Sequence, residues 1–205
     1  IPPAQPGVEH AMLPEQGFVR PGDGVIGGDS HTCTSGALGA FAMGVGSTDL
    51  AAAMVLGELW LSVPPGFAVT FTGKPEAWVT GKDYILKAMG HVGAAGALGM
   101  SVEFRGETIF RLSIEERLTV ANMAVEMGAV NGIFAVDDPA RLWLEARGVD
   151  SDTLSGDEDA VFEKETTIDM TGTGPLVACP DSPDNVAPVA ALESVYLDQV
   201  FIGSC

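Results

Sequence analysis

The sequence predicts an α/β fold, with helices packed against a sheet, on two observations. Segments with the alternation of strands lie between segments with helical spacing along most of the chain. In addition, the apolar pair Val25 and Ile26 runs into two glycines and then into a cluster of polar residues. A buried strand that ends in a tight turn delivers polar side chains to the carboxyl edge of a sheet, where α/β proteins hold their ligands.

The first segment, residues 1–64, is expected to be part of a first α/β domain that carries the polar cluster. A strand is expected over residues 24–26, and a loop over residues 28–39 follows it. Helices are expected over residues 40–45 and 48–60, the second with Ser47 as its N-cap and Asp49 in its first turn.

The second segment, residues 65–138, is expected to form a second α/β domain. It contains an alternating strand over residues 67–72, a helix over residues 82–89 and a strand over residues 101–105. Ser113 and Glu116 then have the spacing of a capping box, which predicts a helix that runs to Met127 and stops at Gly128.

The third segment, residues 139–205, is expected to begin a third α/β domain. We expect a helix over residues 139–147, an exposed acidic loop over residues 150–159, and strands over residues 161–169 and 197–202. The chain starts at Ile1 rather than at a methionine and stops at Cys205, directly after the last expected strand. We therefore expect it to be a fragment of a longer protein.

The net charge and the number of cysteines limit the kinds of partner and the compartment that we expect for this chain. The chain carries 28 acidic and 10 basic residues, a net charge of -18, which would repel nucleic acid and anionic membranes. An anionic substrate would need local cations from a metal or from another polypeptide. No apolar run approaches the roughly 18 residues of a membrane span, no signal peptide opens the chain, and three widely spaced cysteines fit a reducing cytoplasm.

The polar cluster is Asp29, Ser30 and His31, with Cys33 close behind. An acid, a hydroxyl, an imidazole and a thiol within five residues are a candidate catalytic site, although polar residues in a loop also serve as plain turn chemistry. Cys33 is interpreted as a small buried side chain, with a thiol near a bound group as the alternative.

Three further residues are candidates. Asn122 and Glu126 lie four residues apart on the expected capped helix, and so on one face of it; the alternative is a partly exposed polar edge. His10 lies in an expected loop, where a lone histidine is more often structural. His91, at an expected helix end, and Cys179, before a proline, are assigned structural roles.

Taken together these blocks resemble the aconitase superfamily, in particular the large, iron–sulfur subunits of its two-subunit dehydratases for 3-isopropylmalate and homoaconitate. The resemblance implies a three-layer α/β/α iron–sulfur domain, present here in part. The order of the blocks holds along nearly the whole chain. The matching blocks are residues 8–10, 13–15, 28–34, 36–41, 44–49, 122–123, 126–129, 180–185 and 200–205.

The resemblance implies a hydro-lyase that interconverts 2- and 3-isopropylmalate in leucine biosynthesis. A [4Fe-4S] cluster with one iron not bound by protein acts as Lewis acid on the hydroxyl of the substrate. Cys205 stands at the position of one cluster ligand, and the other two ligands form a Cys-x-x-Cys pair that this sequence lacks.

By motif position, Asp29 would pair with His10, and Glu126 with His31, while Ser30 and Asn122 would donate or accept hydrogen bonds around the substrate. The serine base and the arginines that bind substrate carboxylates belong to a swivelling domain, a separate small subunit in these enzymes. The chain alone is therefore expected to be inactive.

Other functions stay open. The order Gly28–Asp29–Ser30 is similar to the nucleophile block of GDS-type serine esterases, but the chain has no histidine after His91 to act as base. A scaffold without activity is a further alternative. Within the dehydratases, homoaconitate or a related hydroxy acid could replace isopropylmalate as substrate.

Overall fold

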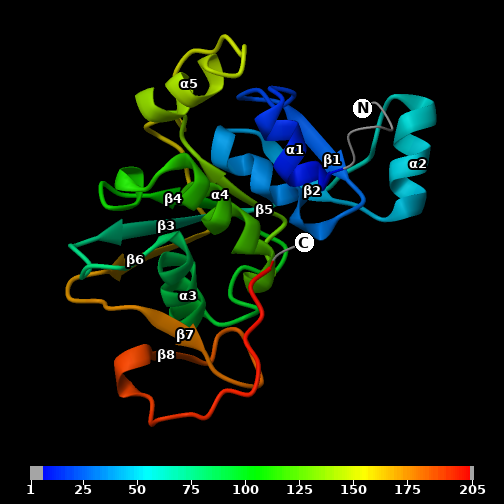
Figure 1. Ribbon diagram of the computed structural model, residues 1–205. Coiled ribbons are helices and arrows are strands. Elements are labelled where there is room, and N and C mark those ends of the chain that lie inside the picture. The colour runs from blue at the N-terminus through cyan, green and yellow to red at the C-terminus, as the bar shows by residue number, and fades with distance from the viewer. Residues whose placement is uncertain (1–6, 204–205) are drawn as a thin grey trace.

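The computed structural model describes residues 7–203, and it confirms the α/β prediction with a parallel sheet flanked by helices (Figure 1). None of the helices in these residues is long and apolar enough to cross a membrane. The helices are α1 (Glu9–Glu15), α2 (Ser47–Leu56), α3 (Gly81–Val92), α4 (Ile114–Asn122) and α5 (Asp138–Glu145). The strands are β1 (Gly24–Gly27), β2 (Phe41–Gly44), β3 (Gly66–Thr72), β4 (Ser101–Arg105), β5 (Asn131–Phe134), β6 (Lys164–Asp169), β7 (Leu176–Ala178) and β8 (Val186–Pro188).

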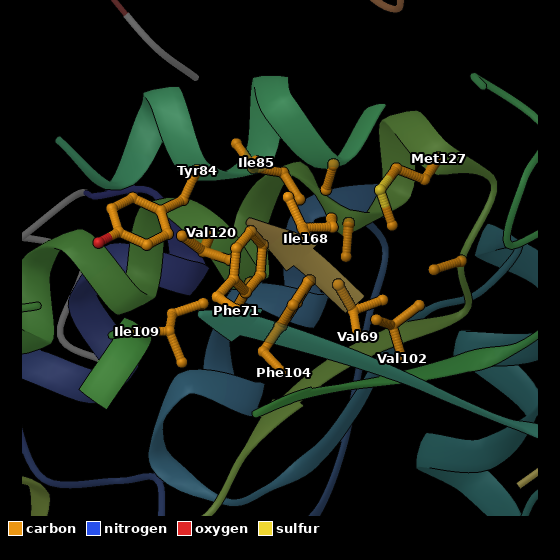
Figure 2. Packing of buried hydrophobic residues seen from close by; sticks show 14 of the residues in the cluster. Val69, Phe71, Tyr84, Ile85, Val102, Phe104, Ile109, Val120, Met127 and Ile168 are labelled. Carbon is orange, nitrogen blue, oxygen red and sulfur yellow. The ribbon is translucent and has the colours of Figure 1, made fainter. Parts of the chain in front are cut away.

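The main core lies between the four-stranded parallel sheet, ordered β5-β4-β3-β6, and the helices α3 and α4 (Figure 2). Alternate residues of the strands face these helices: Val69 on β3 pairs in register with Phe104 on β4, and Phe71 pairs with Ile168 on β6. The opposite face of β4 carries the ion pair between Glu103 and Arg105. The alternation read from the sequence therefore correctly located three of the four strands of this sheet, β3, β4 and β6.

The second sheet consists of β1 and β2, which are parallel and lie beside the larger sheet (Figure 1). They are joined by a 3₁₀ helix, η1 (Ser30–Leu38), most of which is buried. The expected helix over residues 40–45 is wrong, because this run forms β2. A short apolar run fits either element by periodicity. Here Gly39, at φ 75°, ends η1 in the left-handed conformation, and β2 begins two residues later at Phe41.

Other elements also differ from the sequence prediction. Most of the expected loop over residues 28–39 is the 3₁₀ helix η1, and the helix expected to reach residue 60 ends at Leu56, where Gly57 at φ 74° caps it. His10 lies on a short helix, α1, rather than in a loop. The strand β5 and the hairpin β7–β8 were missed. Residues 197–202 form no strand, because no strand among the described residues pairs with them. The strand β6 pairs with β3, so the expected third segment contributes to the sheet of the second.

The predicted helix starts hold well. The capping box of Ser113 and Glu116 is present at α4, and α2 begins one residue earlier than expected, with Gly46 rather than Ser47 as its N-cap. The helix predicted to Met127 is α4 followed by a 3₁₀ segment, η3 (Met123–Met127), and Gly128 at φ 81° ends it as predicted. This change of helix type turns the chain just where Asn122 and Glu126 lie.

Gly36 lets η1 pack directly on β5. A Cβ atom at this position would lie 2.0 Å from the carbonyl oxygen of Gly132 and 2.9 Å from Oδ1 of Asn131. We expect Gly36→Ala to lower the free energy of unfolding by about 3 kcal/mol, because backbone atoms must move to admit the methyl group. Urea unfolding followed by circular dichroism measures this change.

The matched control is Gly24→Ala, because a Cβ at Gly24 meets nothing within 4 Å. We expect that variant to stay within about 1 kcal/mol of the wild type, the size of an intrinsic strand-propensity effect. Equal unfolding midpoints for the two variants would contradict the close packing of η1 on β5.

Candidate active site

The polar cluster lies at the carboxyl end of β1, as predicted. The strand ends at Gly27, and Asp29 is the N-cap of η1, where its Oδ1 accepts a hydrogen bond from the backbone N–H of His31 at 2.7 Å. A carboxylate in this position satisfies an unpaired N–H group at the helix start. The cap fixes the backbone of His31, and its imidazole ring contacts side chains of other elements.

The imidazole of His31 lies between two carboxylates. Its Nδ1 is 3.2 Å from Asp29 Oδ1, and its Nε2 is 3.2 Å from Glu126 Oε1. A neutral imidazole carries one N–H, so both contacts are hydrogen bonds only when the ring is protonated. The contact between Glu126 and His31 is the one that the family resemblance implied. It joins residues that are far apart in the chain.

His10 is buried on α1, with its ring centroid 5.9 Å from that of His31. The expected pairing with Asp29 is not present as a hydrogen bond among the described residues, because the Asp29 carboxylate contacts His31 instead. Burial lowers the pKa of His10, although the nearby charge of Asp29 opposes this shift. The Nδ1 atom is buried without a hydrogen-bond partner in residues 7–203, so a neutral His10 has an atom to offer a ligand.

Asn122 fixes η1 from the side of α4. Its Nδ2 donates a hydrogen bond of 2.8 Å to Oγ1 of Thr34, and this hydroxyl donates to the carbonyl oxygen of His31 at 2.6 Å. Ser30 lies beside the ring, with its Oγ 3.4 Å from His31 Nδ1. Thr34 was missed as a member of the site, although it belongs to the same short motif.

The site opens into a cavity of about 570 Å³ that four of the predicted residues line: His10, His31, Asn122 and Glu126. The second carboxylate oxygen of Glu126, Oε2, is buried and has no hydrogen-bond partner among the described residues. Asp29 and Ser30 lie behind His31 and do not line the cavity. A second cavity of about 500 Å³, beside α2, has a mostly apolar lining and contains none of the candidate residues.

Glu9 and Thr32 connect the two histidines, and sequence reasoning missed both. Thr32, which is buried, has its hydroxyl 2.5 Å from Glu9 Oε1 and 2.6 Å from the carbonyl oxygen of Asp29. A Cβ at Gly27 would lie 2.0 Å from the same Glu9 oxygen. The glycine therefore leaves room for the contact that fastens α1 to η1, and with it His10 to His31.

The described cysteines do not form a metal site. Residues 7–203 contain no group of three histidine, cysteine or acidic side chains placed to hold a metal. The thiol of Cys33 is buried and donates to the carbonyl oxygen of Ala121 at 3.3 Å, while Cys179 is partly buried. The predicted cluster ligand, Cys205, lies outside the described residues.

Burial and the charge of Glu126 raise the pKa of Cys33 to about 12. We therefore expect Cys33 to stay a protonated thiol at neutral pH and to resist alkylation. In a variant that keeps only this cysteine (Cys179→Ser, Cys205→Ser), iodoacetamide at pH 8 should modify the native protein at least 100-fold more slowly than the unfolded protein, because the thiolate is the nucleophile. Fast modification of the native protein would contradict the packing of Cys33.

Comparison with known proteins places this site in a family. Residues 1–200 match the Aconitase family (aconitate hydratase), and the chain belongs to it. Among its relatives, a 3-isopropylmalate dehydratase large subunit from Nitratidesulfovibrio vulgaris (strain Miyazaki F) is 54% identical over 199 residues. A 3-isopropylmalate dehydratase large subunit from Moorella thermoacetica is 51% identical over 200 residues. The 3-isopropylmalate dehydratase large subunit 1 of Methanopyrus kandleri is 48% identical over 200 residues.

These alignments cover 97% of this chain but 48% of each relative. The chain thus spans about half the length of the curated relatives it matches. The family resemblance expected from the motifs is confirmed, whereas the roles of the individual site residues remain predictions.

Proposed function

We propose that this chain is the part of a dehydratase large subunit that moves protons in the interconversion of 2- and 3-isopropylmalate. The observation that carries the proposal is the position of His31 between Asp29 and Glu126 at the wall of the cavity. The names and identities of the relatives support isopropylmalate as the substrate. Dehydration of a hydroxy acid and its reverse need a group that gives and takes a proton at the substrate oxygen.

His31 and its two carboxylates supply such a group. With both ring nitrogens donating, the imidazolium is stabilised by Asp29 on one side and Glu126 on the other. Transfer of the Nε2 proton to Oε1 of Glu126 gives a neutral carboxyl group at the cavity wall, which can pass the proton on to the substrate oxygen. Asp29 then holds the neutral ring through Nδ1 in a single tautomer. His10 adds a buried imidazole whose Nδ1 has no hydrogen-bond partner within residues 7–203, and Asn122 keeps the His31 backbone in place through Thr34.

The iron–sulfur cluster typical of this family supplies, when bound, a Lewis acid for the hydroxyl and carboxylate of the substrate. The described residues do not provide its three thiolates, and the thiol of Cys33 donates a hydrogen bond to the carbonyl oxygen of Ala121 instead. We assign one cluster ligand to Cys205, and we propose that the other two come from residues beyond these 205. The serine base and further arginines would come from the small subunit.

The experiment is an assay of the full-length parent protein, reconstituted with its small subunit, on isopropylmalate, homoaconitate and citrate, together with iron and sulfide analysis. We expect a cluster and the highest kcat/KM on isopropylmalate. A higher kcat/KM on homoaconitate or citrate would overturn the substrate assignment. Esterase turnover without a cluster would support the serine hydrolase, and neither activity nor cluster would leave a scaffold.

A further inference from the structure

The cavity at the candidate site contains two cationic side chains beside the carboxylates of Glu15, Glu115 and Glu126. Besides the histidines it is lined by Lys82, at the start of α3, and by Arg147, which follows α5. The sequence suggested that an acidic chain would have to borrow cations for an anionic ligand. The fold instead brings two of the 10 basic residues to the wall that also carries His10 and His31.

Arg147 is held in place by an aromatic ring. Its guanidinium carbon lies 3.3 Å from the centroid of the Trp143 ring, and its Nη1 donates to the Trp143 carbonyl oxygen at 2.9 Å. The Trp143 indole is fixed in turn, because its Nε1 donates to Glu115 Oε1 at 2.9 Å. A stacked guanidinium loses little freedom when it binds a planar anion.

The donors of these two cations remain available to a ligand. A guanidinium carries five N–H groups, and the bond to Trp143 uses one of them. Within residues 7–203, no carboxylate lies at ion-pair distance from Lys82 or Arg147. The hydrogen bond from Trp143 is the main cause that lowers the pKa of the Glu115 carboxyl, and the charge of Arg147 adds a smaller effect in the same direction.

The length of the cavity along α4 suits a small diacid. Glu115, Thr119 and Asn122 line the cavity along one face of α4, and seven residues of helix from Glu115 to Asn122 span about 10 Å. Glu115 lies toward Arg147, because it accepts a hydrogen bond from Trp143, on which Arg147 stacks. Asn122 lies toward His31, to which it is connected by the Thr34 hydroxyl. In a four-carbon hydroxy diacid, the hydroxyl and the distal carboxylate, with a hydrogen bond of about 3 Å at each end, span about this length.

We propose that Arg147, assisted by Lys82, binds a carboxylate of the hydroxy-acid substrate whose hydroxyl lies at the His31 end. A planar carboxylate matches the fork of the guanidinium and can accept two parallel hydrogen bonds. This proposal rests on the proposed dehydratase function. It makes Arg147 a substrate-binding residue supplied by this chain rather than by the small subunit.

The first test uses the assembled parent enzyme with isopropylmalate. Arg147→Gln should raise KM by about 10-fold to 100-fold, the effect of losing a charged hydrogen bond, and should change kcat by less than about 3-fold because binding is lost equally in ground and transition states. Arg147→Lys should restore KM only in part, because lysine lacks the fork.

Arg141→Gln is the matched control. Arg141 lies on α5 itself, pairs with Glu145 and with Asp138 at 3.5 Å, and does not line the cavity. This variant should keep the wild-type KM. An unchanged KM in Arg147→Gln, with wild-type thermal stability, would overturn the proposal. So would a loss of small-subunit binding in place of a KM effect, since Arg147 would then belong to the subunit interface.

A second readout does not depend on turnover. Isothermal titration of the parent large subunit with malate, a diacid, should show binding that Arg147→Gln weakens by about 10-fold or more, whereas lactate, which lacks the second carboxylate, should bind both forms equally weakly. If the parent turns over neither isopropylmalate nor homoaconitate nor citrate, but malate binding still depends on Arg147, the proposed function fails while the carboxylate site stands. Malate binding that does not respond to Arg147→Gln overturns the site.

Discussion

Replacing Glu126 with glutamine in the assembled parent enzyme is expected to lower kcat by about 100-fold or more, the scale of lost acid–base assistance. The amide keeps the size of the side chain and can still contact His31 Nε2, which Glu126 Oε1 approaches to 3.2 Å. It carries no charge, however, and so cannot stabilise the protonated ring. Steady-state kinetics with isopropylmalate measure the effect.

Glu15→Gln is the control for this prediction. Glu15 lines the same cavity from α1, and it makes no ion pair to His31 among the described residues. Its neutralisation should change kcat by less than about 3-fold, because a surface charge without a hydrogen-bonded partner acts weakly. Wild-type turnover in Glu126→Gln would remove Glu126 from the mechanism, and with it the assignment of His31 as the proton carrier.

The largest expected change in stability comes from Asp137→Asn. Arg117 is fully buried, and its guanidinium donates to both oxygens of Asp137 at 2.8 and 2.7 Å. Asparagine is as good an N-cap as aspartate, so α5 keeps the cap that Asp137 provides through Ala140 N. The buried guanidinium, in contrast, loses its anion. We expect the free energy of unfolding to fall by about 3–5 kcal/mol in urea titrations.

The same pair predicts a pH dependence. Burial tends to raise the pKa of Asp137, but the hydrogen bonds and charge of Arg117 outweigh it and lower the pKa below the ordinary value of 3.8. The unfolded chain therefore binds this proton first as the pH falls, and the stabilisation is present above pH 3.8 and lost toward the lowered pKa. Asp137→Asn should lose this part of the pH dependence, while Arg141→Gln, which breaks an exposed pair, should keep it.

If Asp137→Asn lowers the free energy of unfolding by less than about 1 kcal/mol, the buried guanidinium of Arg117 has another partner.

Much of the fold could be predicted because it depends on local signals. Three strands of the four-stranded sheet, β3, β4 and β6, show the alternation of a strand in their sequences, and a capping box marks the start of α4. The position of Asp29 and His31 was also predicted from a local signal, because an apolar strand followed by two glycines leads directly into the polar cluster. The pairing of His31 with Glu126 needed the family resemblance as well, because nothing local joins residues 95 positions apart.

What could not be predicted depends on tertiary contacts. The run that forms β2 is too short for periodicity to separate helix from strand, and its pairing with β1 decides the outcome. The choice of Asp29 between two histidines is set by the N-cap of η1, which turns its carboxylate toward His31 rather than His10. The contact of Glu9 with Thr32 depends on a missing Cβ at Gly27, and a glycine in a sequence does not show what approaches it.

The order of strands in the larger sheet also constrains how the chain acquires its structure during synthesis. The strand β3 is central, yet one of its neighbours, β6, pairs from Lys164 onward with residues that begin at Phe67. Until the ribosome has released β6, β3 has an open edge with an apolar surface, and such edges pair readily with other chains. Non-local pairing of this kind is slow. A nascent chain that stalls between β5 and β6 therefore exposes the open edge of β3, and chaperone binding in that interval would protect it.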